Sequence, residues 1–461
     1  MAYRIHCRII ACLALSLLIR HGGEALAADG VGTTLRQTVE SAISYNPNVR
    51  AYQEYRQAAE YDLSRARSGW FPRVDVRAGF GFEQVSSPST RAGAAGYRDD
   101  RRGYYSTDDA GLTVSQTIWD GLATWYRVSI GQSRLDSATS RLFDNTEALT
   151  LDALLAHIEI YRQRRICALA ELNVKNHRTI LSSQMERQRS GASTLADVTQ
   201  TQSRLARTEA SLAESRSALE VALANYKRLT GLDAGVLESP LSPAEAYPSL
   251  DAALSSTQYG NFKIKALQSD IETAQFQAEL DKSPFHPQIT LEIGPSYSYH
   301  TGNSLNDTGS MAFMLRAQWN LFDGGYDYYN VKGDKARARQ ARHELSALRD
   351  NISEETTATW SELLSAREQA KFYGNAVQYA TRTRDMYLEQ FNVGQRSLLD
   401  VLDAENEVFS SSIQYVTSQQ NIVAGEYRLL ALGGELLPIF GVNRQGLAVE
   451  TADTEADDAP F

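Results

Sequence analysis

The stretch WFPRVDV at residues 70–76 returns later in the chain as FHPQITL at residues 285–291. Two further stretches are repeated in the same order. TIWDG at 117–121 returns as NLFDG at 320–324, and GASTLADV at 191–198 returns as GQRSLLDV at 394–401. A duplication of this length predicts that each half of the chain is one structural unit of helices and strands.

The first residues of the chain have the pattern of an export signal. Arg4 and Arg8 precede an apolar run over 9–19, and Ala-Leu-Ala at 25–27 is a suitable cleavage site. These features predict a signal peptide at 1–27. Two of the three cysteines would leave with it, so Cys167 would remain as a single buried thiol. The net charge of -10 argues against a nucleic-acid partner.

Proline is missing from two long windows, which predicts two long helices. The windows run from Pro88 to Pro240 and from Pro295 to Pro438, and each has one strong break, at Gly191 and at Gly394. A helix from 121 to 191 would be roughly 100 Å long. After each break, apolar residues recur every seven positions, which predicts left-handed supercoiling against neighbouring helices. An ordinary amphipathic helix is the alternative, but its stripe would drift by roughly 80° over four heptads. The repeating positions are Val198, Leu205, Leu212, Leu219 and Tyr226, then Val401, Val408, Tyr415, Ile422 and Leu429.

Two segments, about 73–119 and about 288–322, alternate between apolar and polar residues and predict one β-hairpin in each half. Strands of about ten residues with one apolar face fit a transmembrane barrel. Aromatic residues near the strand ends, such as Trp70 and Trp319, are typical of the girdles of such barrels. A soluble sandwich with an apolar core face is the alternative interpretation.

Four strands cannot close a barrel, because about eight are needed. Open strand edges are not tolerated in lipid, so membrane-spanning strands would require several copies of the chain. Two copies would give a packed interior and three would leave a lumen. The opposite strand faces carry Asp75, Arg77, Glu292 and Arg316, among others. These residues favour a wet interior and therefore three copies.

The predicted organisation has four parts. The signal peptide at 1–27 is followed by a first structural repeat at 28–240, with its hairpin at about 73–119. A second repeat at 241–433 has its hairpin at about 288–322. The tail at 434–461 ends in an acidic stretch and is predicted to be partly disordered.

The order of these elements, duplicated, resembles the TolC family of outer-membrane efflux and secretion proteins. The resemblance covers about 35–432 and is carried by YNP at 45–47, IWDG at 118–121, LFDGG at 321–325 and FNVGQRSLLDVLDAE at 391–405. It is most similar to the branch that serves type I secretion. The implied fold class is an α+β membrane protein. Four strands from each protomer of a homotrimer form one β-barrel, which continues into a long coiled-coil α-helical barrel.

The resemblance also implies a gate at the periplasmic end. Asp400 and Asp403 match acidic residues that line the closed entrance in this family. Arg396 matches a basic residue that bonds across the closed gate, and Asp197 matches its acidic partner in the first half. Phe391 stands where the best-known member has a tyrosine, so one hydrogen bond of that gate would be missing.

Physical chemistry supports part of this assignment. Asp400 and Asp403 are three residues apart and so share a helix face. Threefold symmetry would gather six carboxylates into a ring that favours cations. The alternative is that they are first-turn residues favoured by the helix dipole.

No chemistry of an enzyme is visible in the sequence. The seven histidines show no metal spacing, and there is no phosphate-binding loop. We therefore expect a non-enzyme without metal or cofactor. The resemblance implies that the protein lies in the outer membrane of a Gram-negative cell and extends into the periplasm. The leading hypothesis is a duct that exports protein, such as a large adhesin or RTX-type toxin, for type I secretion.

The partners that the resemblance implies are a periplasmic adaptor (membrane fusion) protein, an inner-membrane ABC transporter and outer-membrane lipid. Multidrug efflux with a proton-driven RND pump, on the same fold, is the first alternative. A coiled-coil scaffold without a pore is the second. The scaffold leaves the four alternating strands unexplained.

Overall fold

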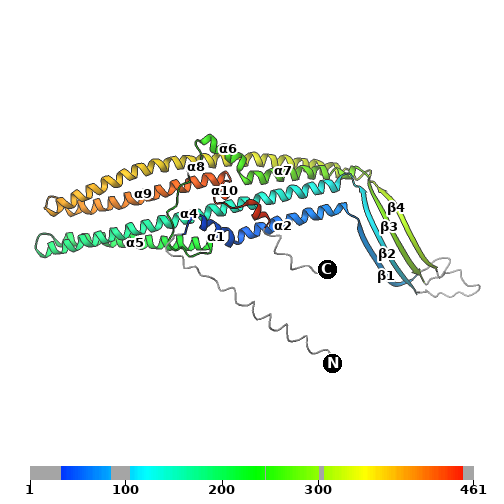
Figure 1. The fold of residues 1–461 in the computed structure, drawn as a ribbon, viewed down its shortest axis with the longest axis horizontal. Coiled ribbons are helices and arrows are strands. Elements are labelled where there is room, and N and C mark those ends of the chain that lie inside the picture. The colour runs from blue at the N-terminus through cyan, green and yellow to red at the C-terminus, as the bar shows by residue number, and fades with distance from the viewer. Residues whose placement is uncertain (1–32, 85–103, 244–245, 301–305, 450–461) are drawn as a thin grey trace, which may run out of the picture.

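The structure is a computed structural model that describes residues 33–84, 104–243, 246–300 and 306–449. The predicted signal peptide, the loop of the first hairpin and the acidic end of the tail lie outside these residues. Figure 1 shows a long helical body, with the four strands at one end and the turns between the longest helices at the other.

The two halves have the same elements in the same order, which confirms the internal repeat. Each half begins with two helices, continues with a hairpin, and ends with a very long helix followed by a shorter one. The first half consists of α1 (Leu35–Tyr45), α2 (Pro47–Arg67), β1 (Arg73–Gln84), β2 (Tyr104–Trp119), α4 (Ala123–Arg189) and α5 (Leu195–Thr230). The second half consists of α6 (Leu250–Gly260), α7 (Phe262–Leu280), β3 (Gln288–His300), β4 (Asn306–Gln318), α8 (Tyr326–Asn392) and α9 (Leu398–Leu432).

The long helices α4 and α8 have the same length, 67 residues each, or about 100 Å at the usual helical rise. Each ends at the expected glycine, which adopts a left-handed conformation with φ of +79° at Gly191 and +80° at Gly394. No helix in the described part of the chain is long and apolar enough to cross a membrane. The seven-residue stripes on α5 and α9 are buried or half-buried, as supercoiled packing requires.

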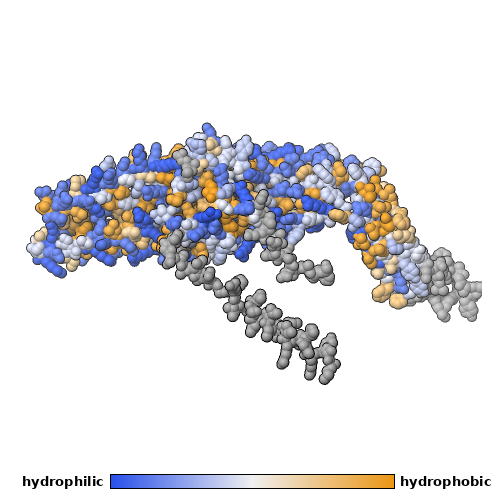
Figure 2. All heavy atoms as spheres, in the orientation of Figure 1, coloured by the Kyte–Doolittle hydropathy of each residue, from blue (hydrophilic) through white to orange (hydrophobic). Residues whose placement is uncertain are grey.

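The four strands form one antiparallel sheet in the order β1-β2-β3-β4. Val74 pairs with Val114, Val114 with Ile293, and Ile293 with Phe313, so one row of the sheet is apolar across all four strands. The opposite face is polar and includes the ion pair between Arg316 and Glu292 at 3.1 Å. Figure 2 shows apolar residues gathered over the strands, in contrast to the largely hydrophilic helices. The predicted alternation is therefore confirmed.

The second hairpin is shorter than predicted. The expected range reached about 322, but β4 ends at Gln318, so Trp319 and Leu321 follow the strand instead of lying in it. The last pair of the ladder joins Gln318 to Gln288, and Pro287 immediately precedes β3. Proline has no N–H group to donate, which explains why the ladder stops there.

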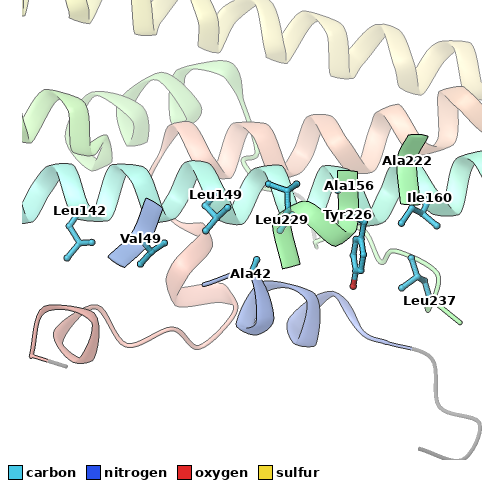
Figure 3. Close-up of a cluster of buried hydrophobic side chains, with 11 residues drawn as sticks. Ala42, Val49, Leu142, Leu149, Ala156, Ile160, Ala222, Tyr226, Leu229 and Leu237 are labelled. Atoms are coloured by element: carbon cyan, nitrogen blue, oxygen red, sulfur yellow. The ribbon is translucent and has the colours of Figure 1, made fainter. Parts of the chain in front are cut away.

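The main core lies midway along the body, where the short helices α1 and α2 pack against α4 and α5. Figure 3 shows Leu149 and Ile160 of α4 pointing toward Tyr226 of α5 and Ala42 of α1. All of these side chains are buried. A second cluster joins α1 and α4 to α9, so this region holds the two repeats together.

The region predicted as the tail contributes two short helices to this core. They are α10 (Leu436–Ile439) and α11 (Arg444–Val449), and the side chains of Leu436 and Leu437 are fully buried. Glu147 of α4 accepts hydrogen bonds from the backbone N–H groups of Leu436 at 3.1 Å and Leu437 at 3.2 Å. Arg444 lies 3.7 Å from the same carboxylate. A buried acid thus fixes the start of α10 against α4.

Glu147 should make stability depend on pH. Burial raises the pKa of Glu147 to about 7, against the two backbone hydrogen bonds and Arg444, which lower it. Between the ordinary pKa of about 4.5 and 7, the folded state holds a proton that the unfolded state has lost. Stability therefore falls as pH rises through this window, by up to about 3 kcal/mol. We expect Glu147→Gln to remove this part of the pH dependence.

Thermal unfolding of wild type and Glu147→Gln, followed by circular dichroism from pH 5 to pH 8, measures the effect. The midpoint of the wild type should fall relative to that of the variant as pH rises. Parallel curves for the two proteins would contradict the assignment. Asp152→Asn is a useful comparison, because burial also raises the pKa of this other acid of α4, which is not among the groups that shift the pKa of Glu147.

Candidate functional site

The candidate site is the end of the body farthest from the strands, where α4 turns into α5 and α8 turns into α9 (Figure 1). We call these two turns the helix tips. Each tip closes in the same way, since Ala192 donates to Arg187 O and Gln395 donates to Gln390 O, both at 2.8 Å. Thr194 and Ser397 then cap the following helices through their side chains. The shared glycine and capping residues explain why the sequence repeats here.

Asp197 belongs to the cap of α5. Its carboxylate accepts hydrogen bonds from the Thr194 backbone at 3.1 Å, the Thr194 hydroxyl at 2.8 Å and the Ser193 hydroxyl at 3.0 Å. The bond from the Thr194 backbone, followed by those from the two hydroxyls, lowers the pKa of Asp197. Within this chain, Asp197 therefore bonds to its own tip and not to Arg396. Its role as the partner of Arg396 across a gate remains a proposal for an assembly.

Arg396 is held within the second tip. Its guanidinium lies over the ring of Tyr387 at 4.2 Å, donates to Gln390 at 3.1 Å, and lies 3.5 Å from Asp400. The backbone of Asp400 also donates to the cap residue Ser397 at 3.3 Å. Asp400 thus lies in the first turn of α9, as the alternative interpretation described, and it has a basic partner as well.

Asp403 binds a residue of the first repeat. Its carboxylate lies 2.9 Å from the guanidinium of Arg204 on α5. Asp403 remains more than half exposed, at 62% of its side-chain surface. The two aspartates of the predicted ring therefore each have an arginine partner within the chain, which reduces the negative charge available to attract cations.

Phe391 binds a second arginine of the first repeat. The guanidinium of Arg187, at the end of α4, lies 4.3 Å from the centre of the Phe391 ring. The same group donates to the carbonyl oxygens of Phe391 at 3.3 Å and Asn392 at 3.5 Å. The aromatic ring without a hydroxyl is therefore still a contact point between the tips.

Arg187 and Arg204 are the site residues that the sequence predictions missed. Both reach from the first repeat to the second, and we call them the arginine ties. Their counterparts in the repeat are Gln390 and Glu407, which carry no positive charge. This difference between the copies was the available signal in the sequence.

A buried acid close to the helix tips contacts the neighbouring helices. Glu405 of α9 is 5% exposed, accepts a hydrogen bond from Asn176 of α4 at 3.2 Å, and lies 3.7 Å from Arg384 of α8. Three helices therefore meet at one carboxylate about two turns from the tip. Among the residues that the structure describes, no group of three or more His, Cys, Asp or Glu side chains could hold a metal ion.

Comparison with known proteins gives one family. The profile described as "Outer membrane efflux protein" matches residues 38–232 and 253–435. Among curated relatives, the outer membrane efflux protein BepC of Brucella suis is 22% identical over 93% of this chain and 90% of its own. The alkaline protease secretion protein AprF of Pseudomonas aeruginosa is 22% identical, covering 89% and 86%. The outer membrane protein TolC of Escherichia coli is 20% identical, covering 92% and 91%.

Solved structures give the same fold. The outer-membrane channel OprN superposes with a TM-score of 0.77 at 18% identity, over 87% of this chain and 90% of that one. The predicted fold class, with helices, one antiparallel sheet and two internal repeats, is confirmed by this likeness and by the elements described above.

Proposed function

Because the chain belongs to the outer membrane efflux protein family, of which TolC is a member, we propose that it is the exit duct of a type I secretion system. It is an outer-membrane channel protein that extends into the periplasm, in a family of transport proteins and not of enzymes. The cargo we propose is unfolded protein, such as a large adhesin or RTX-type toxin.

The observation that supports a duct most strongly is the sheet with one apolar and one polar face, which is joined to the long helical body. One sheet face is apolar from β1 to β4 and the other is polar. Channels of this family are trimeric. β1 and β4 are the edge strands, and the outer edge of each has no partner strand within the described chain. In a trimer each β4 would pair with the β1 of the next copy, which satisfies the backbone groups in lipid.

The helix tips support a gate at the far end of the duct. Asp400 and Asp403 lie on the first turns of α9, and we propose that they face the axis of the trimer. We call α4 with α5, and α8 with α9, the two helical hairpins of the chain. The boundary between helical hairpins would then contain Arg396, Asp197 and Phe391. The arginine ties join the two helical hairpins of one chain in the closed state. A periplasmic adaptor would contact the same end, with energy from an inner-membrane ABC transporter.

Secretion of protein as the cargo is supported by the likeness to AprF, a protease secretion protein, over nearly the whole chain. Drug efflux with an RND pump is the second candidate, and the likeness to the efflux protein BepC favours it. The two functions share the fold and the gate, so they must be separated by what the cell exports.

A gene deletion and its complemented strain distinguish the two candidates. We expect the deletion to remove at least one large protein from the culture medium, as seen by mass spectrometry, while drug susceptibility changes less than about fourfold. Complementation with the wild-type gene should restore the secreted protein. Unchanged secretion together with sharply increased susceptibility would overturn the secretion proposal and favour efflux.

A further inference from the structure

A hollow of about 560 Å³ lies on the helical body between α4, α7 and α8. Its walls include Trp125 and Tyr126 at the start of α4, Phe276 of α7, and three basic residues of α8. We call it the aromatic-basic groove. Its volume is within the range of small-molecule sites in proteins. The helix α7 packs against both α4 and α8 of the same chain, so the walls named here all come from one chain.

The apolar part of the groove is formed by aromatic rings with exposed surface. The Trp125 ring lies 5.0 Å from that of Tyr126 and 6.1 Å from that of Phe276, both in edge-on geometry. Trp125 is 49% exposed. The neighbouring wall residues Ala278 and Ala338 are small and buried, which leaves the space open. A flat apolar group could contact the rings here and cover the indole.

The polar part of the groove is strongly basic. Lys335, Arg339 and Arg342 line it at positions i, i+4 and i+7 of α8, so they form one stripe. In the described part of the chain, none of the three forms an ion pair. By contrast, Arg337 on the adjacent side of the helix pairs with the buried Asp334, and Glu279 of the groove pairs with Lys282. Three cations without counter-charges thus face one hollow.

We propose that the aromatic-basic groove binds an organic anion with a flat apolar body and a sulfonate, carboxylate or phosphate group. The rings contact the apolar body, and the guanidinium groups of Arg339 and Arg342 donate to the acidic oxygens. This site is separate from the helix tips and goes beyond the proposed export function. It does not depend on whether the exported cargo is a protein or a drug.

The probe for this site is 1-naphthalenesulfonate, measured by equilibrium dialysis against the full-length protein in nanodiscs, with empty nanodiscs as the blank. We expect saturable binding of one probe per chain. Arg339→Gln combined with Arg342→Gln should weaken binding by roughly tenfold, because two charge-assisted hydrogen bonds are lost. The neutral analogue 1-naphthol should bind more weakly than the sulfonate to the wild type.

Two further variants separate a built site from general attraction of anions. Lys371→Gln removes one exposed charge from α8 far from the groove and should leave binding unchanged. Trp125→Ala keeps every charge and should weaken binding at least roughly threefold, since the contact between the indole ring and the apolar body is lost. Equal binding by wild type and the double arginine variant would overturn the proposal, as would an unchanged affinity after Trp125→Ala.

Discussion

Gly294→Val should prevent the protein from assembling in the outer membrane. A Cβ atom at Gly294 would lie 1.9 Å from the backbone oxygen of Leu112 and 3.1 Å from the Cα atom of Thr113. Both atoms belong to the backbone of β2, so no side chain can rotate away. We expect a cost of about 3 kcal/mol or more from overpacking and at least roughly a tenfold loss of assembled protein in outer-membrane fractions.

Gly309→Val is the matched control for this prediction. Gly309 lies in β4 of the same sheet, on the face shared with Phe313, and a Cβ atom there would meet nothing within 4 Å. We expect this variant to assemble as the wild type does. Quantitative immunoblots of membrane fractions and size-exclusion chromatography of the extracted protein compare the two. Normal assembly of Gly294→Val would show that the pairing of β2 with β3 differs from that described above.

Loss of both arginine ties should open the channel. Each exposed ion pair contributes about 0.2–1 kcal/mol, and an exposed cation–π contact about 0.5–1 kcal/mol. Three chains would each lose both contacts, so the closed state would lose on the order of 2–6 kcal/mol. We expect Arg187→Ala combined with Arg204→Ala to raise the open fraction in planar bilayers at least roughly tenfold. The currents should also become more cation-selective, because Asp403 loses its partner.

Two comparisons make this result specific to the ties. Arg216→Ala removes another exposed ion pair of α5, at 2.9 Å to Glu171, but that pair stays within the first repeat. It should leave the open fraction unchanged. Asp400→Asn combined with Asp403→Asn should lower cation selectivity, whereas the double arginine variant should raise it. A double arginine variant as closed as the wild type would show that other contacts hold the gate.

The helices and strands were predictable because their signals are local and periodic. Apolar residues at every second position predicted the two faces of the sheet, and apolar residues at every seventh position predicted the packing of α5 and α9. The glycines at the two breaks predicted both helix tips. The predicted end of β4 was wrong because Trp319 and Leu321 continue the apolar–polar alternation of the sequence beyond the point where β3 offers a partner. Pairing depends on the neighbouring strand, and Pro287 ends it there.

The candidate site was only partly predictable. The resemblance named Asp197 and Asp400, and the first-turn position of Asp400 follows from the residues themselves, but the arginine partners of Asp403 and Phe391 do not. Arg204 and Arg187 are about two hundred residues away from them, and which side chains meet depends on the rotation of each helix about its axis. The helices α10 and α11 were also missed. They have four and six residues, too few to show a period, and they are fixed by the distant Glu147.

The arginine ties have a consequence for the symmetry of opening. Two similar repeats in each of three chains would form a ring of six helical hairpins, and such a ring could open evenly. The ties exist only from the first repeat to the second, because Gln390 and Glu407 cannot repeat the contact in the other direction. Around the ring, the contacts between neighbouring helical hairpins would thus alternate, strong within a chain and weak between chains. The entrance would then open at the three boundaries between chains, while the two helical hairpins of each chain stay together.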